Sequence, residues 1–343
     1  MLTGQSWPAH PHPYRDELLT SWLVRIAHAN GVKAQTFCER VFGAQHQIWN
    51  RDMDRLAPEW LLQTLANGSQ RTLKRVKATT LTEFEHILFH ENHSAGQLKW
   101  VLPLSIYHRK HEAYGLQFCP QCLSEDKEPY FRRAWRLALF TFCPKHQVML
   151  LDRCPQCGGP IVFHRIELGH PQQVDAETLA ICWQCGFDLR SATVEAVDKW
   201  DHLAFASWER VLRLLARGGR CKSRFDYSRL DALHQLCAII VSKRLAPKLQ
   251  GYICSLTHQP VHLLSQNRIS FEQRSLFERH YVLGLAWWLM QFWPRRLVKA
   301  WKLKAVKYNE LVKDYDSPPD IYKTGVNEII NLNRRIRKIG YQS

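Results

Sequence analysis

The chain has 343 residues and a formal net charge of +16, because 47 lysine and arginine residues oppose 31 aspartate and glutamate residues. This length predicts two or three domains, and a hydrophobic share of 45% excludes a disordered or collagen-like chain. The positive charge favours a polyanionic partner, nucleic acid above all. The clearest apolar run, Tyr281 to Trp293, is too short to cross a bilayer, and residues 1–14 lack a secretory-signal pattern, so we expect a cytoplasmic protein.

Residues 1–115 are predicted to form a helical domain. Asp16 can cap a first helix, which Asn30-Gly31 ends. A second helix is indicated by apolar residues at helical spacing, namely Ala34, Phe37, Cys38 and Val41. Together they predict a helix-turn-helix-like pair within Asp16 to Phe42. Such pairs also occur without contacting DNA, so DNA reading and plain packing both remain open.

Two further helices are predicted to begin at Pro58 and at Thr80, the second because Thr80 and Glu83 have capping-box spacing. The second of these would carry His86, His90 and His93 at positions i, i+4 and i+7. A metal site there is conceivable, but a solvated helical face is favoured, because the spacing does not match the His-Glu-x-x-His motif of zinc proteases.

Residues 116–198 carry the strongest signal, four pairs of metal-type ligands with two residues between the members of each pair. The eight ligands are Cys119, Cys122, Cys143, His146, Cys154, Cys157, Cys182 and Cys185. A two-residue gap lets a tight turn aim both side chains at one cation, and four such donors complete the tetrahedral shell of zinc. We therefore expect a module with two Zn²⁺ ions, both structural because no coordination position stays open.

Sequential pairing, which gives one Cys₃His site and one Cys₄ site, is favoured because each site then closes a loop of modest length. Interleaved pairing, iron–sulfur binding and unrelated buried thiols are the alternatives. Four cysteines show no paired spacing and are expected to be core residues or free thiols: Cys38, Cys221, Cys237 and Cys254.

Residues 199–343 are predicted to form a basic helical domain, so the fold class is mainly α. Helices are expected at 203–217, 229–243, 270–292, 294–314 and 325–338, with Ser317-Pro318-Pro319 as a breaker. Three basic stretches are candidate contacts to nucleic acid or a partner: Arg210, Arg213 and Arg217; Arg295, Arg296, Lys299 and Lys302; and Arg334, Arg335 and Arg337. The alternative is a set of solvated helix faces, with the neighbouring tryptophans, among them Trp287, buried in the core.

Three stretches of the sequence carry a family resemblance. The first runs from Pro13 to Ala27 and leads to Asn30-Gly31. The second and most specific comprises Phe118 to Leu123, Pro129 to Phe131, Trp135-Arg136, Cys143 to His146, Leu150 and Cys154 to Cys157. The third, weaker match surrounds Trp293-Pro294-Arg295. These stretches resemble the TniQ family, the target-selection proteins of Tn7-like transposons, which include TnsD and the TniQ subunits of CRISPR-associated transposons. Leu18 stands where the family usually has serine.

The resemblance implies an adaptor without an active site, which links an RNA-guided Cascade-type complex, or target DNA, to a TnsC-type AAA+ ATPase that recruits the transposase. It also implies contact with DNA, with guide RNA as a further candidate partner, dimers in the RNA-guided branch, and association with the nucleoid at the target. The chain is shorter than expected of TnsD-type attachment-site readers, which favours the RNA-guided branch. We further expect the zinc knuckles to hold the amino-terminal helical domain rigidly against the carboxy-terminal one.

The alternative function is a sequence-specific, zinc-containing DNA-binding protein, either a TnsD-like attachment-site reader or a transcription regulator whose helix pair reads an operator. An enzyme is the weakest interpretation, because no carboxylate cluster for two-metal chemistry can be assembled from the sequence. The sequence also has no P-loop and no Rossmann fingerprint, so nucleotide hydrolysis would belong to a partner.

Overall fold

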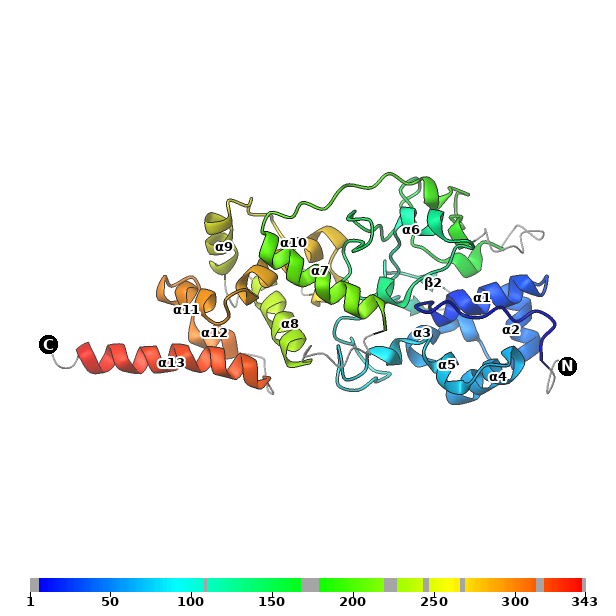
Figure 1. The fold of residues 1–343 in the computed structure, drawn as a ribbon, viewed down its shortest axis with the longest axis horizontal. Coiled ribbons are helices and arrows are strands. Elements are labelled where there is room, and N and C mark those ends of the chain that lie inside the picture. The colour runs from blue at the N-terminus through cyan, green and yellow to red at the C-terminus, as the bar shows by residue number, and fades with distance from the viewer. Residues whose placement is uncertain are drawn as a thin grey trace. The chain divides into compact units, whose positions relative to one another are not determined.

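The computed structural model describes residues 6–107, 110–167, 179–218, 227–242, 247–265, 269–312 and 318–340. Within these ranges the protein is mainly helical, with thirteen α-helices and one two-stranded sheet, which confirms the predicted fold class (Figure 1). No helix in the described ranges is long and apolar enough to span a membrane.

The described residues form two compact units. Unit 1 takes those within 1–85, 90–197 and 213–220, and unit 2 those within 86–89, 198–212 and 221–343. The three-domain division expected at 1–115, 116–198 and 199–343 differs from this one, because the amino-terminal helices and all eight predicted metal ligands fall in unit 1. Hydrogen bonds and ion pairs between residues far apart in sequence, described below, join these helices to the segment that carries the ligands.

Unit 1 is built from short helices and turns. Its α-helices are α1 (Leu19–Ala29), α2 (Ala34–Phe42), α3 (Met53–Leu56), α4 (Glu59–Ser69), α5 (Leu73–Lys77) and α6 (Pro120–Glu125). Strands β1 (Ile106–Tyr107) and β2 (Lys110–His111) pair antiparallel. The 3-10 turns are η1 (Ile48–Asn50), η2 (Leu81–Phe84), η3 (Arg133–Arg136), η4 (Phe163–Arg165) and η6 (Leu189–Ser191).

Helix α1 is the centre of unit 1, since nine of its eleven residues are buried, including Trp22 and Arg25. The expected cap at Asp16 is wrong. Leu18 is the N-cap residue, and no side chain caps the helix. Leu18 is instead fully buried, and its N–H donates to the Phe131 carbonyl at 2.8 Å. The start of the helix is therefore fixed by a distant backbone segment rather than by a local cap.

The turn between α1 and α2 lies at the expected Asn30-Gly31 position. Gly31 has φ of +66°, a left-handed conformation that glycine adopts without steric cost. The Asn30 side chain binds Ala9 on both sides, accepting from its N–H at 3.1 Å and donating to its carbonyl at 2.6 Å. Asn30 thereby ties the amino-terminal segment to the turn, which explains an Asn-Gly pair at this point.

The helix expected to begin at Thr80 is wrong. Only the 3-10 turn η2 forms, and the Thr80 hydroxyl accepts from the Thr82 N–H rather than entering a capping box. The chain then reverses at His86, whose φ is +60°, and the His86 N–H donates to the Phe89 carbonyl. This reversal buries Leu88 and Phe89. His86, His90 and His93 are exposed, but not on a helix.

Unit 2 comprises longer helices, with the first part of α7 (His202–Ala216). The others are α8 (Tyr227–Val241), α9 (Leu249–Thr257), α10 (Leu276–Met290), α11 (Arg295–Lys302), α12 (Tyr308–Val312) and α13 (Asp320–Gly340), with the 3-10 turn η7 (Phe271–Gln273). Helix α8 packs on α10 and α13, and α13 packs on α11 and α12 (Figure 1). The core is apolar and aromatic, as Trp208 and Leu236 illustrate.

Two long helices expected in unit 2 are interrupted. The one expected at 270–292 is divided into η7 and α10, because the Ser275 hydroxyl accepts the Glu278 N–H and caps a new helix. The one expected at 294–314 is divided into α11 and α12. There Lys304 adopts a left-handed φ of +58°, and the reversal brings Ala305 and Val306 into the core.

Candidate metal centres

The structure gathers four predicted ligands, Cys119, Cys122, Cys143 and His146, into one cluster. The Cys122 and Cys143 Sγ atoms are 3.7 Å apart, and His146 Nδ1 lies 3.3 Å from Cys119 Sγ and 3.4 Å from Cys122 Sγ. In a zinc tetrahedron with bonds of about 2.3 Å, two sulfurs are about 3.8 Å apart. The donor atoms thus already lie at zinc-like separations.

The second cluster contains Cys154, Cys157, Cys182 and Cys185. Its Sγ atoms are 3.6 Å apart for Cys154 and Cys185 and 3.7 Å apart for Cys157 and Cys182. Each cluster thus joins consecutive pairs, as the sequential pairing predicts. Cys154 and Cys182 are buried, whereas Cys157 and Cys185 are exposed.

Three of the four ligand pairs lie in the same backbone turn. In each, the N–H four residues after the first cysteine donates back to that cysteine's carbonyl at 2.9 Å, from Gln147, Gly158 and Gly186. These three donors all have positive φ, between +59° and +75°, a conformation that favours glycine. Gln147 adopts it without being glycine. The fourth pair lies instead at the start of α6, where Cys119 is the N-cap and Pro120 follows.

The donor chemistry fits a structural metal ion such as zinc. Each cluster offers four soft or borderline ligands, enough to close a tetrahedral shell with no position for a reacting water. The thiols also influence one another: hydrogen bonds from Cys119 and Cys122 lower the pKa of Cys143, while the same kind of contact raises the pKa of Cys122. Ionising all of them together needs a cation to offset their mutual repulsion.

Glu125 provides an outer contact to the first cluster. Its carboxylate lies 3.0 Å from His146 Nε2, the ring nitrogen that faces away from the sulfurs, and also pairs with Lys145. Metal-ligating histidines commonly use their second nitrogen in this way, which fixes the ring orientation. Lys145 and then His146 lower the pKa of Glu125. The first cluster is therefore supported beyond its four ligands.

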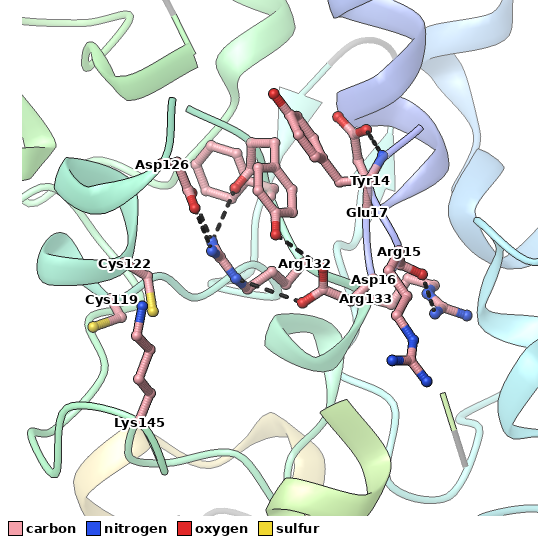
Figure 2. A network of polar contacts seen from close by, with 12 residues as sticks. Tyr14, Arg15, Asp16, Glu17, Cys119, Cys122, Asp126, Arg132, Arg133 and Lys145 are labelled. Carbon is pink, nitrogen blue, oxygen red and sulfur yellow. Dashed lines mark hydrogen bonds and ion pairs between the residues drawn. The ribbon is translucent and has the colours of Figure 1, made fainter. Parts of the chain in front are cut away.

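A partly buried polar network joins this module to the segment ahead of α1, and Arg132 is its centre (Figure 2). Its guanidinium binds Asp126 through both terminal nitrogens at 2.7 and 3.0 Å, and its Nε lies 3.6 Å from the Asp16 carboxylate. Asp16 also accepts from the Tyr130 hydroxyl at 2.9 Å. The Asp126 end follows α6 directly, so Arg132 connects the first metal cluster to the amino-terminal segment.

Glu17, fully buried, is the second junction. It accepts from Arg25 at 2.8 Å and from the Tyr14 N–H at 2.9 Å, and Arg25 continues to Glu128 at 2.7 Å. Burial raises the pKa of Glu17 to about 7, although Arg25 opposes the shift. Beside it, the Ser21 hydroxyl accepts the Phe131 N–H at 2.9 Å. The two motifs of the sequence analysis, 13–27 and 129–131, therefore bind each other directly.

Arg136 forms a third junction, with Asp52 and Asp54. Its side chain is fully buried and bonds Asp52 at 2.6 and 3.0 Å and Asp54 at 3.2 Å. Asp54 in turn accepts from the N–H and the hydroxyl of Thr20 at 2.8 and 2.9 Å. Sequence reasoning missed these aspartates, because isolated acids in a helical region have no spacing signal.

Glu167, also missed, lies at the N-terminus of α2. Its carboxylate oxygens accept the Ala34 N–H at 2.8 and 2.9 Å, and one of them lies 2.6 Å from His28 Nε2. An anion here satisfies an orphan amide and complements the helix dipole. The second helix of the pair is thus capped by a residue 133 positions away.

The basic residues predicted to contact nucleic acid or a partner differ from one another in exposure. Arg210, Arg213 and Arg217 are exposed and share one side of α7 and its end, opposite the buried residues Trp208, Val211, Leu212 and Leu215. On α11, Arg295, Lys299 and Lys302 are exposed. Arg296 is half-buried, because it stacks on Trp288 at 4.0 Å and donates to its carbonyl at 2.6 Å. The Arg296 guanidinium thus has a structural role.

Other predicted residues complete this comparison. Trp287 and Trp288 are buried as expected, and Trp293 and Trp301 are half-buried. Cys38, Cys237 and Cys254 are buried thiols. Cys221, and the side chains of Arg334, Arg335 and Arg337 on α13, lie outside the described residues.

These features define a class: a mainly helical protein in which the α1–α2 helix pair is joined by buried ion pairs to a module with two four-ligand Cys/His clusters. Residues 8–150 match the family model described as TniQ. These residues therefore carry a TniQ domain, in agreement with the resemblance seen in the sequence. The matched segment includes the first metal cluster and ends before the second. No curated protein matches the chain at a significant level.

Proposed function

We propose that this protein is a non-enzymatic adaptor for transposition target selection. It would link an RNA-guided Cascade-type complex, or target DNA itself, to a TnsC-type AAA+ ATPase, which recruits the transposase. The observation that carries the proposal is the TniQ match over residues 8–150, because a TniQ domain supports a role in transposition target selection. The finer assignment of partners comes from the family resemblance and the charge of +16.

The chemistry of unit 1 suits a binding scaffold. Both clusters use four Cys or His ligands, so a metal held there would stabilise the fold and leave no site for an activated water. The buried carboxylates Glu17, Asp54 and Glu167 all bind arginine, histidine or backbone amides, as structural acids do. Rigid support of this kind positions surface groups for a partner.

Direct reading of DNA by the helix pair is the second candidate. Helix α2, the second of the pair, exposes Gln35, Glu39 and Arg40, and polar side chains of these types can reach base edges in a major groove. Gln35 donates to Glu39 at 2.7 Å, so the exposed acid remains on this face, where it would oppose phosphates. This candidate describes a TnsD-like reader or a regulator.

A transposition assay in cells tests the adaptor directly. Omitting the protein from an otherwise complete transposition system should abolish targeted insertion, and co-purification should recover the ATPase together with the RNA-guided complex. Insertion that continues without the protein would contradict the proposal.

Selection of the purified protein against a random duplex DNA pool separates the two candidates. Binding that depends on salt but enriches no motif supports the adaptor, because phosphate contacts carry no sequence information. An enriched motif supports the direct reader instead. Gln35→Ala together with Arg40→Ala should then remove the motif and leave the thermal unfolding temperature unchanged.

A further inference from the structure

A shallow pocket of about 310 Å³ lies within unit 1, beside the first metal cluster. Three segments distant in sequence line it: the start of the amino-terminal motif, the Cys143–His146 turn and the end of α7. The lining residues are Arg15, Asp16, Pro144, Lys145, Arg213, Ala216 and Arg217. Four of these seven side chains are cationic, and one is acidic.

Two arginine side chains hold the segments of this pocket together by hydrogen bonds to backbone carbonyls. Arg213 donates to the Pro144 carbonyl at 2.8 Å, which places the end of α7 against the ligand turn. Arg133, a buried residue, donates to the Arg15 carbonyl at 3.1 Å. Its guanidinium also lies beside Gly218, where an added Cβ would be 3.5 Å away. The same buried side chain therefore binds the Arg15 backbone and lies next to the residue that follows α7.

The charge of the pocket remains positive. The one acid in its lining, Asp16, is engaged by the Tyr130 hydroxyl and Arg132, as described above (Figure 2). Lys145 pairs with Glu125, but both side chains are at least half exposed, and such pairs contribute little in water. Within the part of the chain that the structure describes, neither Arg15 nor Arg217 lies within ion-pair distance of a carboxylate. Arginines arranged in this way match phosphate oxygens through their forked donors.

We propose that this pocket, hereafter the Arg15 pocket, binds a backbone phosphate of duplex DNA. Its lining offers no aromatic ring for a base to stack on and no large apolar side chain to anchor a peptide. Those absences among the lining residues favour a duplex backbone over a single strand or an acidic protein segment. The inference rests on the proposed role at target DNA. It gives a function to the Arg15 guanidinium, whereas the polar network described above uses only the Arg15 carbonyl.

Binding of a labelled 30-base-pair duplex of scrambled sequence, followed by fluorescence anisotropy over a salt series, tests the pocket. Arg15→Gln with Arg217→Gln should weaken binding about ten-fold near 0.1 M salt for each phosphate contact that is lost. The slope of log K against log salt concentration should decrease in magnitude by about 0.9 for each such contact. A control that removes two charges elsewhere on unit 1, Lys74→Gln with Lys110→Gln, should bind nearly as the native chain does. Both pairs are exposed, so thermal unfolding should be unchanged in both.

Two outcomes would overturn the assignment. One is equal weakening by the pocket variant and the control, which would mean general attraction to a basic surface. The other is tighter binding to single-stranded RNA of the same length, with equal sensitivity to the pocket variant. Arg15→Lys with Arg217→Lys, which keeps both charges, should restore most of the affinity. An unchanged affinity of the Gln variant for the duplex would show that the pocket does not bind DNA. It would leave the proposed adaptor role intact, since that role is judged by insertion and co-purification.

Discussion

The two metal clusters have the same pairing but different surroundings. In the first, three ligands are buried and the fourth, His146, is half-buried. Beside it, Glu125 contacts His146, and Asp126 is joined through Arg132 to Asp16, ahead of α1. In the second, two of the four cysteines are exposed, and the nearby pair Asp188–Arg190 is formed by residues two positions apart. The outer groups beside the first cluster thus bind a distant segment, whereas the Asp188–Arg190 pair beside the second is local. The long-range contact of the second cluster is made by Glu167, in the loop between Cys157 and Cys182.

Loss of a ligand in the first cluster is expected to have the largest effect. Cys143→Ser should release one of two metal ions and unfold unit 1, because a structural zinc ion contributes on the order of 10 kcal/mol, comparable with the whole stability of a domain. Metal analysis and circular dichroism measure both changes. Cys38→Ala, which removes a buried thiol that is not a ligand, is the control and should keep both ions.

The matching change in the second cluster sharpens the comparison. Cys157→Ser, at an exposed ligand, should also release one ion but leave the helical signal of α1 and α2 largely in place. Complete unfolding by Cys157→Ser would show that unit 1 depends equally on both clusters. Retention of both ions would show that Cys157 is not a required ligand.

Breaking a buried arginine network is expected to cost less than losing the metal. Arg136→Met leaves Asp52 and Asp54 without their guanidinium, and such a change typically lowers the free energy of unfolding by about 3–5 kcal/mol. Arg190→Met, beside the second cluster, removes a partly exposed pair and should cost less than about 1 kcal/mol. Urea unfolding of the two variants measures the difference, and equal costs would contradict the comparison.

The smallest expected effect is a difference in pH dependence. Glu17 has a folded pKa of about 7, above its ordinary value of 4.5, so it binds its proton more tightly in the folded state. Its contribution therefore favours folding below pH 4.5 and declines as pH rises toward 7. Relative to Glu17→Gln, the native chain should lose about 2–3 kcal/mol of unfolding free energy between pH 5 and 8.

Asp188 provides the contrasting sign. Its hydrogen bond with Arg190 lowers its pKa, so its contribution is present above the ordinary pKa of an aspartate and lost as pH falls below it. Relative to Asp188→Asn, the native chain should lose a small amount of stability on acidification toward pH 3. Chemical unfolding at several pH values compares the two variants, and the same sign in both would contradict these assignments.

Much of this architecture could be predicted from patterns that are local in sequence. The eight ligands have a fixed two-residue spacing, and α1, α2 and α7 show helical periodicity over continuous segments. The predictions were wrong where a contact with a distant residue decides the local conformation. The helix expected at Thr80 gives way to a reversal that buries Leu88 and Phe89, and the cap expected from Asp16 is replaced by a bond to Phe131. Asp52, Asp54 and Glu167 have no periodic signal, since their partners are many residues away.

The cap that Glu167 supplies to α2 sets an order of events during synthesis. The carboxylate that will accept the Ala34 N–H is made 133 residues after Ala34 itself, which at 5–20 residues per second corresponds to roughly 7–27 s. During this time the N-terminus of α2 has no cap, because Glu167 has not yet been made. A recombinant fragment limited to residues 8–150, the matched family segment, would end before that carboxylate, so we expect it to fold less stably than one extended past residue 167.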